Sequence, residues 1–88
     1  MSSFKLEWKP SLKHDLKHIN KSQIPGIIKS IENLGTNPYP PQSQKLTNAL
    51  MTYRLRVGDY RVIYQVDQTQ KIVSVYHIRH RKDAYRRR

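Results

Sequence analysis

Three arginines around one tight turn could together bind a phosphate group. Arg54, Arg56 and Arg61 lie in a segment that alternates apolar and polar residues on both sides of Gly58 and Asp59. That pattern predicts a β-hairpin, and a two-residue loop places Arg56 directly opposite Arg61, with Arg54 on the same face. Like charges that face each other across strands are destabilising, whereas guanidinium groups on a rigid platform are suited to phosphate. The arrangement therefore indicates a phosphate site.

A histidine, an arginine and a tyrosine follow near the C-terminus, at His80, Arg81 and Tyr85. With the hairpin arginines, such a set could cleave RNA through the neighbouring 2′-hydroxyl. This reaction needs a base for the hydroxyl proton, an acid for the leaving 5′-oxygen, and positive charge on the transition state. Imidazole can serve as acid or base, and tyrosine can stack a base, or act as a base itself where guanidinium charge lowers its pKa. The sequence lacks the grouped carboxylates of two-metal nucleases, so we predict no metal and no cofactor.

Plainer interpretations exist for several of these residues. Arg54 and Arg56, each taken alone, are typical solvated strand residues, and Arg61 opposite them is what favours a function. His14 and His18 are spaced to ligate a metal, but no third ligand is evident and the surrounding surface is rich in lysine. We therefore expect them to be ordinary surface histidines.

The length and composition of the chain predict its domain organisation and the class of its partner. The 88 residues predict a single domain, 1–88, with a formal net charge of +11. Residues 51–88 hold all eight arginines, whereas residues 1–50 hold seven of the lysines. This excess predicts a polyanionic partner, with nucleic acid first and an acidic protein second. The absence of cysteine and of a long apolar run predicts a soluble cytoplasmic protein with no membrane partner.

The elements that must position the arginines follow from periodicity. Phe4, Leu6 and Trp8 alternate as in a strand, and two short helices follow before a proline-rich loop at 36–44. The predicted fold is α+β in the order β-α-α-β-β-β, an antiparallel sheet with a two-helix hairpin packed on one face. The second helix has the apolar stripe Ile24, Ile27, Ile28, Ile31 and Leu34.

The register of the last strand, from residue 71 to about 79, depends on whether the strand is regular. The simplest pairing places Tyr64 opposite Val73, so that Ile78 and His80 share the open face with the arginines. One bulge would exchange His80 for Arg81 on that face. We expect residues 81–88 to form a basic C-terminal tail.

The string 53–64, followed by a valine-rich strand and by His80-Arg81-Lys82-Asp83-Ala84-Tyr85, resembles RelE-type toxins of the RelE/ParE toxin-antitoxin superfamily. The resemblance implies a microbial-RNase-like fold. It also implies an endoribonuclease that enters the ribosomal A site and cuts the bound mRNA, leaving a 2′,3′-cyclic phosphate. The implied partners are the ribosome, mRNA and an acidic cognate antitoxin, through which the toxin-antitoxin complex could bind operator DNA.

The resemblance also assigns roles by position. Arg54 and Arg56 match a basic pair that is lysine in familiar members, and arginine cannot lose a proton as lysine can. We therefore move the general-base role to Tyr85, with His80 or Arg81 assisting the leaving group. The predicted catalytic residues are Arg61, Arg81, Tyr85 and His80, and the predicted RNA-binding residues are Arg54, Arg56, Arg79 and Lys82.

Two other functions remain open on the sequence. A ParE-like inhibitor of DNA gyrase would have the same fold without nuclease chemistry, and a plain RNA-binding module would bind with steep salt dependence but not cleave. The full set of arginines together with Tyr85 favours the nuclease.

Overall fold

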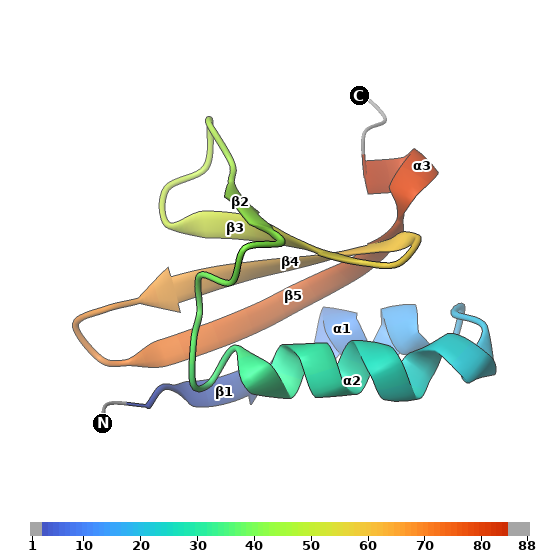
Figure 1. Ribbon diagram of the computed structural model, residues 1–88, viewed down its shortest axis with the longest axis horizontal. Coiled ribbons are helices and arrows are strands. Elements are labelled where there is room, and N and C mark those ends of the chain that lie inside the picture. Colours follow the sequence, from blue (N-terminus) through green and yellow to red (C-terminus); the bar gives the residue numbers. More distant parts are fainter. Residues whose placement is uncertain (1–2, 85–88) are drawn as a thin grey trace.

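The computed structural model describes residues 3–84 of the chain. Five strands form one sheet in the order β1-β5-β4-β3-β2, and α1 and α2 lie on one side of it (Figure 1). Within the described part, no helix is long and apolar enough to cross a membrane. The elements are β1 (Lys5–Trp8), α1 (Pro10–Leu16), the 3-10 turn η1 (Lys21–Gln23), α2 (Ile24–Asn33), β2 (Ser43–Lys45), β3 (Thr52–Val57), β4 (Tyr60–Asp67), β5 (Ile72–His80) and α3 (Arg81–Ala84).

The predicted α+β architecture is confirmed, with three additions. The first strand, β1, pairs parallel to β5, so the sheet is mixed, while β2 to β5 are antiparallel as expected. Strand β2 lies at the end of the predicted loop, and its three residues are too few to show an alternation in the sequence. Helix α3 forms at the start of the segment predicted to be a tail.

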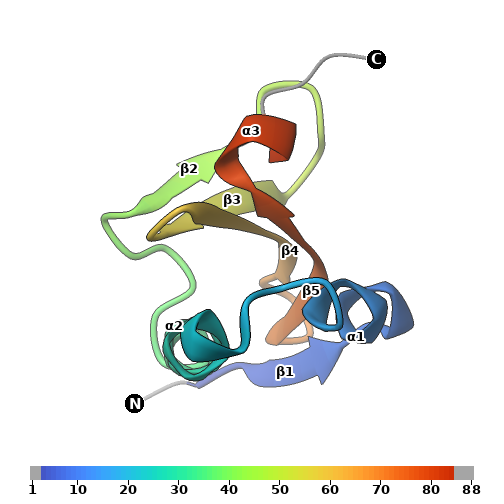
Figure 2. The ribbon, with the colours of Figure 1, turned by 90° about the vertical axis from the view of Figure 1, so that its right-hand side faces the viewer.

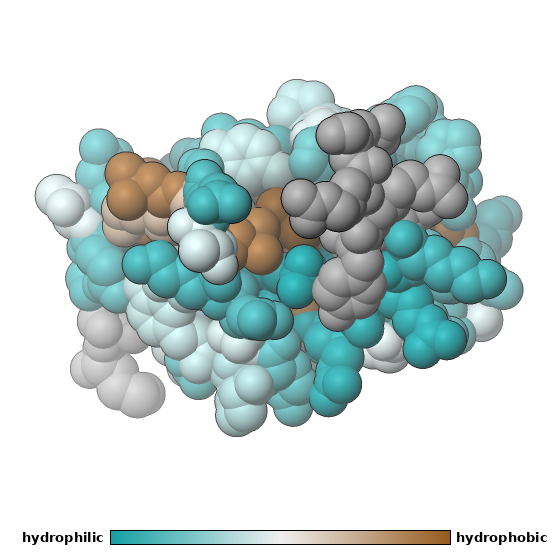
Figure 3. Space-filling view, turned by 90° about the horizontal axis from the view of Figure 1, so that it is seen from above, coloured by the Kyte–Doolittle hydropathy of each residue, from teal (hydrophilic) through white to brown (hydrophobic). Residues whose placement is uncertain are grey.

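The core lies between the two helices, α1 and α2, and the helix-facing side of the sheet. Ile27, Ile31 and Leu34 of α2 are buried, as the apolar stripe predicts, and they belong to one cluster with the sheet residues. Burial of each such side chain stabilises the fold by roughly 1.5–3 kcal/mol. The sheet contributes Leu55, Val62, Tyr64, Val66, Val73, Val75 and Ile78 to this cluster. The side of the sheet that faces away from the helices is largely hydrophilic, with a smaller hydrophobic region (Figure 3).

The predicted register of β4 against β5 is wrong by two residues. Tyr64 faces Val75 and not Val73, because the connecting turn is longer than expected. The Asp67 carboxylate accepts a hydrogen bond from the Gln70 backbone N–H, and Lys71 adopts a φ of 58°. Since the error is an even number of residues, Val73 and Val75 still face the helices and are buried.

A register shift between Ile63 and Tyr64 then changes the face of the end of β5. Beyond the shift, Val62 faces Ile78, which is buried and not on the open face as predicted. His80 likewise pairs with Tyr60, while Arg79 pairs with Arg61. The bulge considered from the sequence is therefore present.

Helix α1 lies along the part of β5 that β1 does not reach. Strand β1 pairs with residues 72–75 of β5, and α1 lies beside the rest of that strand (Figure 2). The Ser11 hydroxyl donates to the Tyr76 carbonyl oxygen at 2.6 Å, and the Ile78 backbone N–H donates to Asp15 Oδ2 at 3.0 Å. Side chains of α1 thus bind backbone groups that a neighbouring strand would otherwise bind.

Tyr64 makes the free energy of unfolding depend on pH in the alkaline range. Its side chain is fully buried and donates a hydrogen bond to the Pro38 carbonyl oxygen at 2.6 Å. Burial raises the pKa of the hydroxyl from 10.0 to about 12. The stabilisation by the protonated hydroxyl is therefore complete below a pH of about 10 and is lost as the pH rises to about 12.

We expect the free energy of unfolding of the wild type to fall across this window by about 2–3 kcal/mol relative to that of Tyr64→Phe. Urea unfolding of both proteins at a series of alkaline pH values measures this difference. The comparison removes the contribution of all other titrating groups, because both proteins contain them. A difference between them that does not change with pH would contradict the prediction.

Candidate nucleic-acid site

The β3–β4 hairpin positions the first arginines as predicted. Arg56 pairs with Arg61 and Val57 pairs with Tyr60, so the loop has two residues. Gly58, the first of them, has a φ of 58°, which is the conformation that a type II′ turn requires at this position. The sequence prediction of the hairpin and its register is confirmed.

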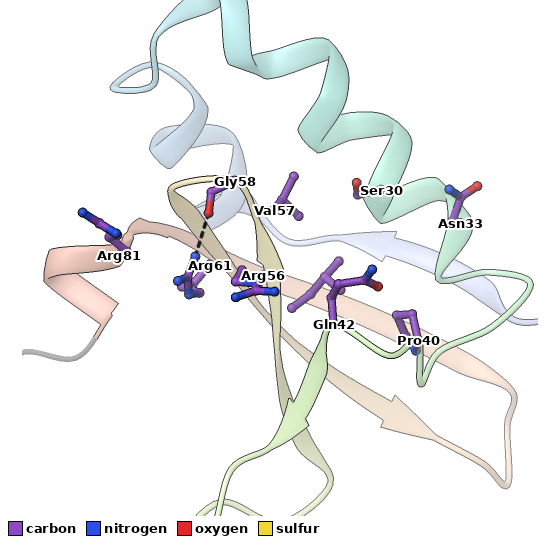
Figure 4. Close-up of a pocket in the computed structure, with 10 residues that line it drawn as sticks. Ser30, Asn33, Pro40, Gln42, Arg56, Val57, Gly58, Arg61 and Arg81 are labelled. Atoms are coloured by element: carbon purple, nitrogen blue, oxygen red, sulfur yellow. Dashed lines mark hydrogen bonds between the residues drawn. The ribbon is translucent and has the colours of Figure 1, made fainter.

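The structure resolves the repulsion between Arg56 and Arg61 by placing them in different surroundings. Arg61 is 7% exposed, and its Nη1 donates to the carbonyl oxygen of Gly58 at 3.0 Å (Figure 4) and to that of Tyr60 at 2.9 Å. A buried cation needs such hydrogen bonds to offset the loss of hydration. Arg56 is exposed and keeps its hydration. Arg61 is therefore part of the hairpin structure as well as a source of charge.

Three arginines from separate parts of the chain line one open pocket of about 710 Å³. Arg56 and Arg61 come from the hairpin, and Arg81 comes from the first position of α3 (Figure 4). A polar wall is formed by Ser30 and Asn33 of α2 together with Gln42, which lies next to Arg56 (Figure 4). No pattern in the sequence indicated this wall, because only the fold brings its residues to the arginines.

A second hollow of about 340 Å³ extends this surface toward β2. It shares Gln42, Arg56 and Arg61 with the larger pocket and adds Arg54. Arg54 Nη2 donates to Gln44 Oε1 at 3.3 Å, which directs its guanidinium toward β2. The two hollows together form the arginine surface, defined by Arg54, Arg56, Arg61 and Arg81.

A backbone contact brings Arg81 to this surface. The Arg81 N–H donates to the Asp59 carbonyl oxygen at 2.7 Å, which fastens the start of α3 to the hairpin turn. The side chains of the two residues are 4.0 Å apart and largely exposed, so their ion pair adds little. The position of Arg81 is therefore fixed mainly by the main chain.

Three other predicted residues lie elsewhere in the described part. Arg79 Nη1 donates to Asp15 Oδ2 at 2.8 Å, beside α1. His80 has its ring edge-on to Tyr60 at 5.5 Å and does not line the arginine pocket. Lys82 is exposed on α3. The predicted base, Tyr85, lies outside the residues that the structure describes.

The described part of the arginine pocket offers charge and hydrogen-bond donors. Its lining there contains no aspartate, glutamate or histidine. Among the described residues, no group of three or more histidine, cysteine, aspartate or glutamate side chains could hold a metal ion. These residues can therefore bind a phosphate and stabilise negative charge that develops on it, whereas proton transfer needs a further group.

Comparisons with known proteins identify relatives over nearly the whole chain. Residues 6–85 match the family model described as ParE toxin of type II toxin-antitoxin system, parDE. A curated relative from Methanocaldococcus jannaschii, the candidate toxin RelE1, is 31% identical over 86 residues, which cover 94% of this chain and 96% of that protein.

Solved structures with a similar fold include two toxin-antitoxin complexes. The RelBE2 complex of Mycobacterium tuberculosis gives a TM-score of 0.79 at 20% identity, covering 90% of this chain and 99% of the matched chain. The RelE-RelB complex of Pyrococcus horikoshii gives a TM-score of 0.78 at 24% identity, covering 90% and 96%. At these identities the likeness shows the shared fold.

The different surroundings of Arg56 and Arg61 predict different effects on stability. Arg61→Ala removes the donor from two carbonyl oxygens of the turn, and we expect it to lower the free energy of unfolding by about 1–3 kcal/mol. Arg56→Ala removes an exposed side chain and should change that energy by less than about 0.5 kcal/mol. Urea unfolding of both variants is the measurement, and equal losses would refute the structural role of Arg61.

Proposed function

This chain belongs to the RelE/ParE family of type II toxin-antitoxin toxins, and from that premise we propose that it is a metal-independent endoribonuclease that cuts mRNA in the ribosomal A site. The observation that carries the proposal is the convergence of Arg56, Arg61 and Arg81 on one open pocket. Three cations around one hollow suit a group whose negative charge grows during the reaction, as that of a phosphodiester does when it is attacked.

In the proposed reaction, the 2′-oxygen of the nucleotide before the cut attacks the adjacent phosphorus. The bond from phosphorus to the 5′-oxygen breaks, which leaves a 2′,3′-cyclic phosphate and a 5′-hydroxyl. Arg56 and Arg81 hold the non-bridging oxygens, and Arg61, fixed to the turn carbonyls, keeps the hairpin rigid and adds charge. Fixed donors need no reorganisation as charge develops.

The proton transfers are assigned to the C-terminal motif. We assign the base that takes the 2′-hydroxyl proton to Tyr85. The position of Arg81 in the pocket supports it as a group that also stabilises the leaving 5′-oxygen, which takes its proton from water as the bond breaks. His80 directly precedes Arg81 but lines a different hollow, so its participation would require the end of β5 to move.

The proposal is tested by primer extension on mRNA in programmed ribosomes with an empty A site. Wild-type protein should produce a cut within the A-site codon that is absent without ribosomes. Arg81→Ala should lower the cleavage rate about 100-fold or more, as expected when one transition-state donor is lost. Arg81 is preferable to Arg61 for this test, because loss of Arg61 also weakens the fold.

The matched control is Lys29→Ala, which removes one exposed cation from α2 without touching the arginine pocket. It should cut as fast as the wild type. Equal rates for Arg81→Ala and Lys29→Ala would overturn the assigned role of the pocket, and no cut by folded wild type would overturn the nuclease.

A second candidate function follows from the family model that matches, which is that of the ParE toxin. In this alternative the chain inhibits DNA gyrase by binding and cuts no RNA. A gyrase supercoiling assay separates the two, since a nuclease that acts in the ribosome has no reason to slow supercoiling.

The toxin is also proposed to have an acidic antitoxin that covers the arginine surface. Solved relatives of the same fold are complexes of RelE with RelB, and the net charge of +11 favours an acidic partner. We expect the affinity for the partner encoded beside the toxin to fall as salt rises. It should also fall at least tenfold in Arg54→Ala/Arg56→Ala/Arg81→Ala, on the basis of the usual strength of charge pairs at interfaces.

Titration calorimetry at two salt concentrations measures this affinity. Lys13→Ala/Lys17→Ala/Lys29→Ala is the control, because it removes the same number of exposed charges from the helices. Equal affinity of both triple variants would show that the partner docks elsewhere.

A further inference from the structure

A separate hollow lies where the C-terminal end of α1 meets the end of β5. Its volume is about 260 Å³, and we call it the α1–β5 hollow. Buried Ile19 and Ile78 lie in its lining and supply an apolar floor. We propose that this hollow binds a nucleobase, that of a nucleotide next to the phosphate held by the arginines.

Aromatic and imidazole rings form the sides of the hollow. His18, Tyr60 and His80 line it, and the Tyr60 and His80 rings are nearly perpendicular, at 82° with centroids 5.5 Å apart. These two rings already contact each other, so a planar base would not enter between them but would stack on a ring face that is turned toward the hollow. Stacking on aromatic and histidine side chains is a usual way for proteins to hold unpaired RNA bases.

The polar lining matches the edge of a base. Asp15 and Arg79 both line the hollow, and Arg79 Nη1 donates to Asp15 Oδ2 at 2.8 Å. The same oxygen accepts from the Ile78 backbone N–H and lies 3.1 Å from His77 Nδ1, so the carboxylate has a fixed orientation and a base would meet its other oxygen, Oδ1. A carboxylate accepts from an exocyclic amino group, and a guanidinium donates to a carbonyl oxygen or ring nitrogen. The pair therefore favours cytosine, adenine or guanine over uracil, which has no amino group.

The position of the hollow relates it to the arginine surface. Tyr60 directly precedes Arg61 in β4, and His80 directly precedes Arg81 in the chain. In each pair the first residue lines the α1–β5 hollow and the second lines the arginine pocket. Successive side chains of a strand point to opposite faces of the sheet, so the two sites are related by a shared end of β4 and β5 and not by a shared face. The role as a subsite for RNA rests on the proposed function, whereas the binding of a base does not.

Histidine side-chain NMR spectra of the full chain provide a test without ribosomes and without cleavage. Cytidine monophosphate should shift the imidazole signals of His18 and His80 in a saturable way. Uridine monophosphate should do so more weakly, and ribose 5-phosphate, which has no base, should leave both signals in place. Equal shifts with ribose 5-phosphate, or no shift at either histidine, would overturn the proposal.

Variants test whether cytidine monophosphate binding depends on the residues of the hollow or only on the positive charge of the protein. His18→Ala changes an exposed residue and should weaken cytidine monophosphate binding roughly fivefold or more, as loss of a stacking ring does. Tyr60→Leu should act in the same direction. Tyr76→Leu is the matched control, because Tyr76 is a partly exposed tyrosine of β5 that does not line the hollow. Equal losses in Tyr60→Leu and Tyr76→Leu would also overturn the assignment.

Base binding and RNA cleavage can fail separately. If the base binds and no RNA is cut, the base-binding proposal is supported and the nuclease proposal is overturned. If RNA is cut in the A site and the histidine signals do not respond to cytidine monophosphate, the nuclease stands and the hollow falls.

Discussion

The arrangement of the C-terminal half depends on one irregularity, the register shift between Ile63 and Tyr64. Side chains alternate between the faces of a strand, so a strand that continued without this shift would exchange its buried and exposed residues. Val62 would then face His77 in place of Ile78, and an apolar side chain would leave the core as an imidazole entered it. The shift keeps apolar residues against the helices along the whole of β5. It also sets the face on which the chain leaves that strand, and hence where Arg81 arrives.

The arginine surface shows how a small fold can concentrate positive charge and remain stable. Each of three cations is accommodated differently: Arg61 by the carbonyl oxygens of its own turn, Arg56 by hydration, and Arg81 by a main-chain anchor at Asp59. The turn carbonyl oxygens hold the Arg61 guanidinium in place, so an anionic ligand meets a donor that is already oriented.

The sequence predicted those features that depend on neighbouring residues. The hairpin and its register follow from Gly58, Asp59 and the alternation around them, and the structure agrees. The turn before β5 was not predictable, because its length depends on a hydrogen bond from the Gln70 backbone N–H to the Asp67 carboxylate and on the backbone conformation of Lys71. The polar wall of the arginine pocket was missed for a related reason. Its residues come from α2 and the segment before β2, and packing brings them to the hairpin.

The way in which the sheet ends has a consequence for association between copies of the chain. An open strand edge is a template for pairing with another strand. At one edge lies β1, only four residues long, and beyond it Ser11 and Asp15 of α1 occupy backbone groups of β5. The opposite edge is β2, three residues long and preceded by Pro40 and Pro41. Within residues 3–84, neither edge offers a long run of unpaired backbone, which disfavours edge-to-edge aggregation and leaves recognition of the molecule to its side chains.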